Sequence, residues 1–332
     1  MIMEEKHFCR NCDKYTIHKE IKKVMYCTVC EPEIPNKFRM EKYQLWYKIK
    51  EVKNALVYQL MYREGAVLGE RKRVRNMKIR EVSHLQENIK KFRILEEPVN
   101  WYYSVAVLKT MPIFSFNPVQ RKIESKQFIQ TFNLFMDGFD LPLDFDSKHV
   151  EFETTLSDMR KVHKWMQVNN IPHVVRASGA GFHILVYSNY LWQKPFHFRP
   201  SLSPLLCWVV VCALKRELKL KSLDTSVVDF RRIWKVPYSM DIKTGNICRP
   251  LNDYEIDHFN FEMLSMEYCI NHRGVFKRSM FVGNSRGLNK FIFSLFADKC
   301  KTSMKIWKYL ERILEENEGD RRKILEDLFG GE

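Results

Sequence analysis

The 332-residue chain has no long apolar segment, no internal repeat and no low-complexity tract. Its longest apolar run, Leu205 to Leu214, is shorter than the ~18 residues that a membrane-spanning helix needs. The N-terminus carries Glu4, Glu5 and Lys6 where a signal peptide would have an apolar core. The sequence therefore predicts no membrane segment and a cytoplasmic location.

Acidic residues are fewer than basic ones. The chain has 40 Asp and Glu against 55 Lys and Arg, a formal net charge of +15. Such an excess favours a polyanionic partner, nucleic acid or an anionic surface, although a basic cytosolic protein without such a partner has the same charge. A hydrophobic content of 45% and an aromatic content of 13% are typical of a folded chain.

The nine cysteines fall into two groups. Two CxxC pairs fourteen residues apart match the spacing of a four-thiolate zinc site: Cys9, Cys12, Cys27 and Cys30. We expect residues 1–34 to form a zinc ribbon, with 15–20 and 22–26 paired as a small hairpin. A redox CxxC would need only one pair and a surrounding βαβ pattern. The others have no ligand spacing and are expected to be small buried hydrophobes: Cys207, Cys212, Cys248, Cys269 and Cys300.

Residues 38–95 show apolar positions at helical spacing and predict helices. A basic cluster lies within them: Arg71, Lys72, Arg73, Arg75, Lys78 and Arg80. Two interpretations stay open at this point. The cluster is either a solvated helical face or a contact with a nucleic-acid backbone.

The middle of the chain has a mixed pattern that predicts an α+β fold. Strands are expected at 101–108, 133–136, 141–146, 173–177, 182–187 and 227–235. Asp137-Gly138 is a hairpin signal between the second and third of these. Helices are expected from Ser157 to Asn169, from Leu202 to Leu218 and through most of the chain after residue 255.

Two aspartates one residue apart, Asp144 and Asp146, follow an apolar approach on a predicted strand. Side chains alternate across a strand, so both carboxylates point to one face. Carboxylate oxygens are ligands for hard divalent cations. A DxD at a strand end can equally be a solvated pair. Of the neighbouring acids, Asp137 is explained by its turn, and Asp140 stays a candidate.

Two further segments follow. Ser178-Gly179-Ala180-Gly181-Phe182-His183 is a glycine-rich loop whose backbone N–H groups can hold phosphates. Asp229-Phe230-Arg231-Arg232 leads into Lys243-Thr244-Gly245. In this order the motifs indicate metal-dependent chemistry on a nucleotide triphosphate.

The stretch from about 100 to 250, somewhat under half of the chain, resembles the catalytic domain of the archaeo-eukaryotic primase superfamily. That family has a DxD on a strand, a Ser-Gly loop ending in His, and a third Asp, in this order. The third segment here carries the family's run of residues at matching spacing: Asp229, Arg232, Lys235, Pro237, Ser239, Lys243, Thr244 and Gly245.

The chain departs from the family in several places. Lys235 stands where the family often has Arg, and Asp241 where many small subunits have His. The glycine loop is one residue shorter, and the zinc motif lies at the N-terminus. These differences indicate a divergent branch, such as one carried by a mobile element. The resemblance implies a primase-polymerase core, an RRM-like mixed sheet with helices, at 99–254. It would be preceded by the ribbon (1–34) and a basic helical segment (35–98), and followed by a helical segment (255–332).

The resemblance also implies nucleotidyl transfer by two metal ions, Mg²⁺ or Mn²⁺, held by Asp144, Asp146 and Asp229. Residues expected to hold the incoming triphosphate are Ser178, Gly179, Gly181, His183, Arg232, Lys243 and, with less support, Arg176. The alternatives are a core histidine for His183 and a solvated turn lysine for Lys243. Zn²⁺ would be structural.

The leading hypothesis is a DNA primase or primase-polymerase acting on a single-stranded DNA template with NTPs, dNTPs or both. A primer-extending polymerase of end-joining repair shares the motifs. A third hypothesis is a non-catalytic DNA-binding replication protein, against which the three aspartates argue. The chain has no helicase motif and no Walker lysine, so unwinding is expected from a helicase in trans.

Overall fold

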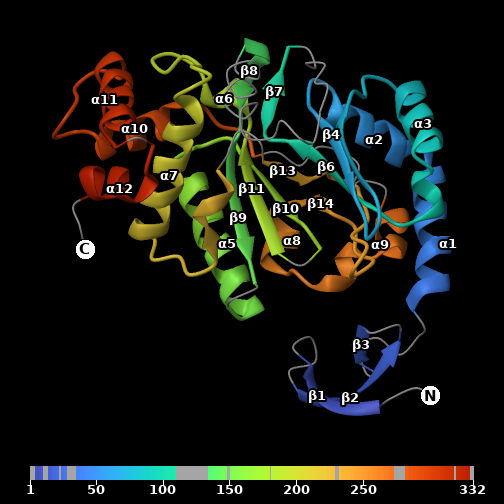
Figure 1. The fold of residues 1–332 in the computed structure, drawn as a ribbon. Coiled ribbons are helices and arrows are strands. Elements are labelled where there is room, and N and C mark those ends of the chain that lie inside the picture. Colours follow the sequence, from blue (N-terminus) through green and yellow to red (C-terminus); the bar gives the residue numbers. More distant parts are fainter. Residues whose placement is uncertain are drawn as a thin grey trace.

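A computed structural model describes residues 4–9, 14–21, 24–27, 35–109, 134–147, 150–179, 181–228, 232–272, 281–317 and 319–329, with side chains from residue 40 onward. Its described helices and strands are mixed along the chain, as the α+β prediction requires (Figure 1).

The N-terminal strands form a small antiparallel sheet in the order β1-β2-β3. Its strands are β1 (Glu4–Cys9), β2 (Lys14–Ile21) and β3 (Val24–Cys27). The predicted hairpin is confirmed, because β2 and β3 pair from Ile21↔Val24 to His18↔Cys27.

The segment predicted to be helical throughout contains a β-hairpin, so that prediction was partly wrong. Helices α1 (Pro35–Lys48), α2 (Lys50–Leu60) and α3 (Val82–Lys91) are present, and η1 (Ile94–Glu96) is a 3₁₀ turn. Between them lie β4 (Gly65–Leu68) and β5 (Arg73–Met77). The reason is a long-range pairing that local periodicity does not record: β4 pairs with β6 (Asn100–Ser104).

Two sheets make up the body of the protein. The larger has the order β12-β9-β11-β10-β14 and the smaller the order β13-β6-β4-β5. Their remaining strands are β9 (Leu141–Asp146), β10 (Val174–Ala177), β11 (Gly181–Val186), β12 (Leu223–Asp224), β13 (Ile233–Lys235) and β14 (Arg249–Leu251). The basic N-terminal segment thus contributes two strands to a sheet that it shares with β6 and β13.

The predicted hairpin around Asp137-Gly138 is not present. β8 (Met136–Phe139) runs through both residues and pairs with β7 (Ala106–Leu108). A Cβ on Gly138 would lie 1.9 Å from the Ser188 hydroxyl oxygen. Gly138 is therefore explained by close packing, not by a turn.

Helices cover one face of the larger sheet. Phe152, the first residue of α5 (Phe152–Val168), packs on Phe182 of β11, which lies opposite Phe145 of β9. The helix begins five residues before its predicted start. The prediction of a buried helix near 202–218 is confirmed by α7 (Ser203–Glu217).

The chain after β14 is helical, as predicted. Its helices are α8 (Asp253–Asp257), η4 (Phe261–Leu264), α9 (Met266–Asn271), α10 (Arg286–Leu295), α11 (Ser303–Glu316) and α12 (Arg321–Phe329). α12 contacts α7, where Arg216 Nη1 donates to Phe329 O at 3.1 Å. Helices α10 to α12 lie at the opposite side of the molecule from α1 to α3 (Figure 1).

Burial agrees with the sequence patterns. One hydrophobic cluster runs through both sheets and their helices. The five cysteines outside the zinc motif are free thiols, four buried and Cys212 partly exposed. Burial raises the pKa of Cys248 to about 11. Within the described part of the chain, no helix has the length and apolar character that a bilayer crossing requires.

Two buried histidines, His163 of α5 and His173 just before β10, form a chain that ends on Asp253 of α8. His173 Nδ1 donates to Ile171 O at 2.7 Å, and its Nε2 lies 2.9 Å from His163 Nδ1. His163 Nε2 lies 3.0 Å from Asp253 Oδ1. Phe281 stacks on His173. His173 is fully buried, and burial lowers its pKa to about 4, with backbone acceptance by Ile171 opposing the shift.

This histidine predicts a loss of stability in mild acid. The unfolded chain binds a proton near the ordinary histidine pKa of about 6.5, whereas the folded His173 does not. Below that pH, the free energy of unfolding should fall by about 1.4 kcal/mol per pH unit for this group, until its folded pKa is reached. The contribution of His173 is measured by urea unfolding of the wild type and of His173→Gln, each near neutrality and at about pH 5. An equal pH dependence in both proteins would contradict it.

Candidate functional site

Asp144 and Asp146 share the face of β9 that points away from α5. Leu143 and Phe145 are fully buried, whereas both aspartates are partly exposed. Asp144 retains 24% of its side-chain exposure. The prediction that the two carboxylates lie on a strand is confirmed, and the burial pattern places them on one face.

The sheet register places three further polar residues in one row with Asp144. Asp224 of β12 and His183 of β11 are its direct partners, and Arg176 of β10 is the partner of His183. Residues paired directly across antiparallel strands point to the same face. The row therefore runs Asp224, Asp144, His183, Arg176.

His183 is buried between the two sheets. The centroid of its ring lies 4.2 Å from the ring centroid of Trp234 on β13, and its Nε2 lies 3.5 Å from Asp144 Oδ1. Burial, with the nearby charges of Arg176 and Lys235, holds the pKa of His183 well below its usual range, so its ring is neutral near pH 7. Its Nδ1 has no hydrogen-bond partner among the described residues. The ring is thus a core residue whose Nε2 edge faces Asp144.

The glycine loop connects β10 to β11 beside this row. Ser178 N donates to Gly181 O at 2.9 Å and closes the loop. Gly179 has φ +102°, a conformation that L side chains rarely adopt. A Cβ on Gly181 would lie 2.3 Å from Phe145 O. Both glycines are therefore required by the backbone, and they bring the loop against the strand that carries the aspartates.

The Lys-Thr-Gly turn lies against this loop. Asn246 Nδ2 donates to Gly179 O at 3.2 Å, and Gly245 has φ +74°. The side chain of Lys243 is exposed. Arg232 is partly exposed, and its Nη2 donates to Ser226 O at 3.1 Å. The structure thus brings the second and third motifs together, with Lys243 on the solvent side.

Asp229 lies outside the described residues, so the structure does not place the predicted third carboxylate. The strand expected over 227–235 is shorter: a 3₁₀ turn, η3 (Thr225–Val227), precedes it, and β13 begins at Ile233. Asp224, which sequence reasoning missed, lies directly opposite Asp144. It accepts a hydrogen bond from Ser226 N at 2.8 Å as the cap of that turn. The position of Asp224 opposite Asp144 depends on the register between β12 and β9, which the sequence alone does not show.

Arg176 has a structural position. It is fully buried, and its guanidinium donates to the hydroxyls of Tyr103 and Tyr187, the latter at 2.7 Å. In this position Arg176 connects the two sheets, and a nucleotide cannot reach it. Its burial therefore argues against the predicted phosphate contact.

Asp140 is also structural. It is fully buried, and its carboxylate lies 2.7 Å from Arg63 Nη2 and accepts from Ser188 N at 2.9 Å. Burial raises its pKa, although Arg63 opposes the shift. Asp140 thus ties the segment before β4 to the starts of β9 and α6 (Ser188–Leu191), and it no longer competes for the role of metal ligand.

Asp140→Ala should destabilise the fold. The change would leave Arg63, whose side chain is only 10% exposed, without its carboxylate partner. Removing one member of a buried ion pair costs about 3–5 kcal/mol. Chemical unfolding measures the loss, and Asp137→Ala, at an exposed aspartate on β8, is the matched control. Equal stability of the two variants would contradict this assignment.

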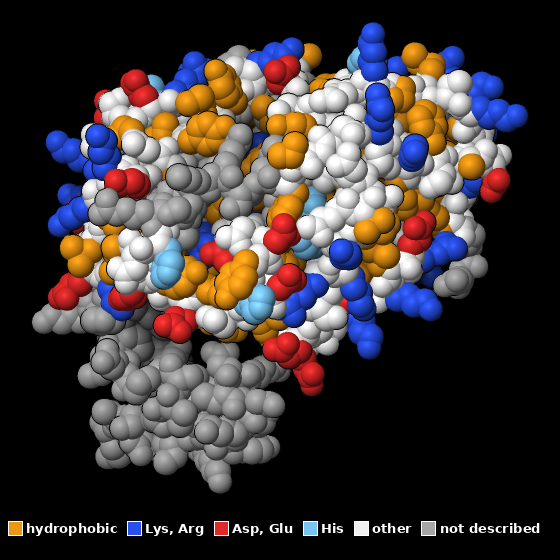
Figure 2. All heavy atoms as spheres, turned by 180° about the vertical axis from the view of Figure 1, so that it is seen from behind, with side chains coloured by type: hydrophobic (Ala, Val, Ile, Leu, Met, Phe, Trp, Pro, Cys, Tyr) orange, Lys and Arg blue, Asp and Glu red, His pale blue; other side chains and the backbone are white. Residues whose placement is uncertain are grey.

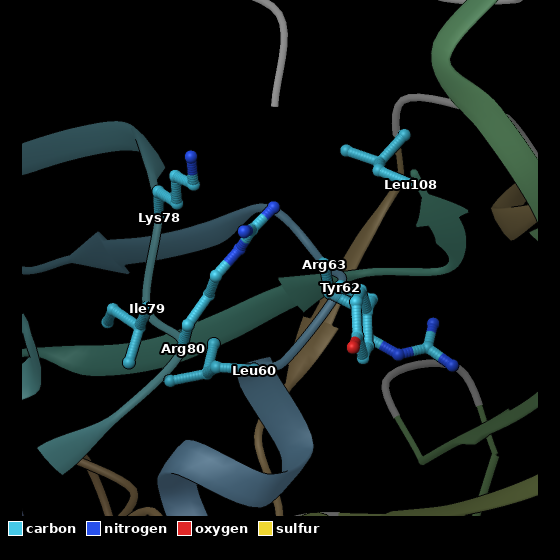
Figure 3. Close-up of a pocket in the computed structure, with 7 residues that line it drawn as sticks. All are labelled: Leu60, Tyr62, Arg63, Lys78, Ile79, Arg80 and Leu108. Carbon is cyan, nitrogen blue, oxygen red and sulfur yellow. The ribbon is translucent and has the colours of Figure 1, made fainter. Parts of the chain in front are cut away.

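The basic cluster lies on and after the β4–β5 hairpin and not on a helix. Arg75 pairs with Glu64 through two bonds of 2.7 and 2.8 Å. Lys78 and Arg80 line a small pocket with Arg63 and Tyr62. The side chains of Lys78 and Arg80 extend in a common direction, whereas the Arg63 guanidinium points away from them (Figure 3). On the face seen from behind, Lys and Arg side chains gather at both sides and form no continuous stripe (Figure 2).

The candidate metal ligands are carboxylates of β9 and β12. Among the described residues, no three His, Cys, Asp or Glu side chains converge closely enough to form a metal site. Asp144 and Asp146 nevertheless offer hard oxygen donors from one face of one strand, and Asp224 lies across from them. Carboxylate oxygens are the ligand type that Mg²⁺ and Mn²⁺ prefer.

The N-terminal sheet places one cysteine of each CxxC pair at the end of a strand, Cys9 opposite Lys14 and Cys27 opposite His18 of β2. β1 and β3 each run antiparallel to β2 and so run parallel to each other. Cys9 is the last residue of β1, and Cys27 is the last residue of β3. Cys12 and Cys30 lie outside the described residues.

No family model and no curated protein matches the chain. The order of its motifs along the chain resembles that of the archaeo-eukaryotic primase superfamily. Solved structures with a similar fold include the polymerase domain of Mycobacterium tuberculosis Ligase D in complex with DNA, at 11% identity and a TM-score of 0.44, covering 87% of this chain and 91% of that one.

Two other solved structures also match. The primase-polymerase domain of Cyanophage S-2L has 9% identity and a TM-score of 0.35, covering 64% of this chain and 89% of that one. The catalytic domain of primase Repb' in complex with initiator DNA has 11% identity and a TM-score of 0.35, covering 60% of this chain and 84% of that one. Each of the three is a primase or polymerase domain.

Proposed function

We propose that the chain is a divergent primase or primase-polymerase that joins nucleotides on a single-stranded DNA template. The observation that carries the proposal is that the strand with the DxD pair, the Ser-Gly loop and the Lys-Thr-Gly turn lie together. Asp144 pairs with His183 and Asp146 with Gly181, and the Ser-Gly loop contacts the turn through Gly179.

Within this proposal, Asp144 and Asp146 hold divalent metal ions. Asp224 and the predicted Asp229 are the two candidates for the third carboxylate. Two bound ions would supply activation of the attacking 3′-hydroxyl and stabilisation of the pyrophosphate leaving group. The neutral His183 supports Asp144 through its Nε2 edge. Trp234 packs against the ring and holds it in place, so the ring can orient the Asp144 carboxylate. Because the ring is neutral, it leaves the negative charge of that carboxylate available to a metal ion.

The incoming triphosphate is assigned to the two linked loops. The backbone of Ser178, Gly179 and Gly181 offers N–H groups close to β9. Lys243 is exposed on the turn and can act as a point charge toward phosphate, and Arg232 can make bidentate contacts. Lys78 and Arg80 are proposed to contact the template backbone, where such charges act without sequence preference. A helicase in trans remains a prediction.

The test is unprimed synthesis on single-stranded DNA with labelled NTPs and dNTPs in separate reactions. The proposal expects short template-dependent products with Mg²⁺ or Mn²⁺. Extension of a supplied primer without any unprimed product would favour the end-joining type of polymerase. DNA binding without synthesis under either condition would favour the non-catalytic hypothesis.

We further propose that Cys9, Cys12, Cys27 and Cys30 bind one zinc ion that supports initiation. A segment of 1–34 has no core without its ion, whereas the aspartates belong to the separate large sheet. Deleting 1–34 should therefore reduce unprimed synthesis by about 10-fold or more and leave primed extension within about two-fold. Metal analysis should find one zinc per chain. Equal losses in both assays, or an absence of zinc, would contradict this role.

A further inference from the structure

Asp241 connects the two proposed nucleotide loops. Its Oδ1 accepts from Lys243 N at 2.8 Å, from Thr244 N at 2.9 Å and from the Thr244 hydroxyl at 3.2 Å. Its Oδ2 accepts from Lys235 Nζ. The same ammonium group donates to Ser178 O at 3.0 Å. One carboxylate and one ammonium thus join the Lys-Thr-Gly turn to the Ser-Gly loop.

Close packing supports this connection. A Cβ on Gly179 would lie 3.0 Å from Asp241 Cβ, so the glycine loop lies directly against Asp241. Asn246 Nδ2 adds a second bond, to Gly179 O at 3.2 Å. The two loops therefore share one interface, and Asp241 is at its centre.

The pair is largely removed from solvent. The side chains of Lys235 and Asp241 are 12% and 8% exposed. Burial alone would raise the pKa of Asp241, but Lys235 and the N–H groups of the turn outweigh it and lower the pKa. An ion pair this buried depends on both partners, because removing one leaves an uncompensated charge.

We propose that Lys235 and Asp241 are paired positioning residues that hold the Ser-Gly loop and the Lys-Thr-Gly turn in one arrangement and thereby set nucleotide affinity. This inference rests on the proposed function. Because Lys235 is engaged by Asp241 and Ser178 O, it acts through the loops and not as the principal phosphate contact.

The test compares Lys235→Met, Asp241→Asn and the double variant with the wild type in nucleotide incorporation. Asp241→Asn keeps an oxygen for the turn and removes the charge that pairs with Lys235. Each single variant should raise the KM for nucleotide by about 10-fold or more, with kcat within about two-fold. The double variant should be no worse than the worse single variant, since both changes break the same contact. Lys235→Arg should retain most of the affinity.

The control is Glu267→Gln, which removes an exposed ion pair with Lys42 outside the site and should leave KM unchanged. Two results would overturn the inference. If Lys235→Met raises KM while Asp241→Asn lowers it, Lys235 is a direct phosphate contact and Asp241 only repels the ligand. If neither variant changes KM, the pair has no role in binding.

Hydrogen exchange separates this inference from the proposed function. In the wild type without nucleotide, the amides of 178–179 and 243–245 should be protected together, and Asp241→Asn should accelerate exchange in both loops. If the wild type incorporates no nucleotide but this coupled exchange is seen, the proposed function fails and the positioning role stands. If exchange changes only in the turn that contains Asp241, the positioning role fails.

Discussion

Asp144→Ala and Asp146→Ala should each abolish nucleotide incorporation while the protein stays folded. Both carboxylates lie on the open face of β9, and neither supplies the apolar core that Leu143 and Phe145 form on the other face. Loss of a carboxylate that holds the ions should reduce the rate at least about 1,000-fold. The measurements are incorporation of labelled nucleotide with Mg²⁺ or Mn²⁺, and thermal unfolding of each variant.

The matched control is Asp137→Ala, because Asp137 is an exposed aspartate on the neighbouring β8 and pairs only loosely with Lys109 at 3.5 Å. It should keep nearly full activity. Asp140→Ala is unsuitable as a control, since its buried pair with Arg63 makes it a stability variant. Near-wild-type incorporation by either Asp144→Ala or Asp146→Ala would remove the metal assignment.

Asp224→Ala should cause a second large loss, about 100-fold or more, if Asp224 is the third carboxylate of the site. The reason is its position directly opposite Asp144 on the same face of the sheet. Asp229→Ala is the comparison, because the spacing of the third motif predicts that residue instead. Incorporation assays at saturating nucleotide and varied Mn²⁺ measure both variants.

The outcome distinguishes two interpretations of one motif. A large loss in Asp224→Ala with a small one in Asp229→Ala would show that register, and not the spacing before Arg232, identifies the third ligand. The reverse result would restore the assignment made from sequence and leave Asp224 as the cap of η3. Asp224→Asn retains a side-chain oxygen for that cap and separates the loss of charge from the loss of the turn.

The residues around Asp144 and His183 could be predicted from the sequence because their signals are local. An apolar strand ending in DxD and a Ser-Gly loop between two β-branched segments define β9, β10 and β11. The sequence marks Gly179 and Gly181 as parts of a glycine-rich loop, and the structure shows that only glycine fits both positions. The buried helix α7 was equally accessible from its apolar run.

The remainder depends on contacts between distant parts of the chain. The β4–β5 hairpin was predicted as helix because its partner, β6, follows about thirty residues later, and local periodicity carries no sign of that pairing. Asp137-Gly138 has the composition of a turn, but Ser188 packs against its glycine. The burial of Arg176 by Tyr103 and Tyr187, and the pairing of Lys235 with Asp241, likewise arise only in the folded chain.

The activity that we propose for the face carrying Asp144 and Asp146 is the template-directed joining of nucleotides. Its most direct test is incorporation of one labelled nucleotide opposite a defined template base, with pyrophosphate measured in the same reaction. Wild-type protein should incorporate the complementary nucleotide and release one pyrophosphate for each addition, and Asp144→Asn should do neither. Absence of incorporation by folded wild-type protein, on primed and unprimed DNA with either metal ion, would contradict the account.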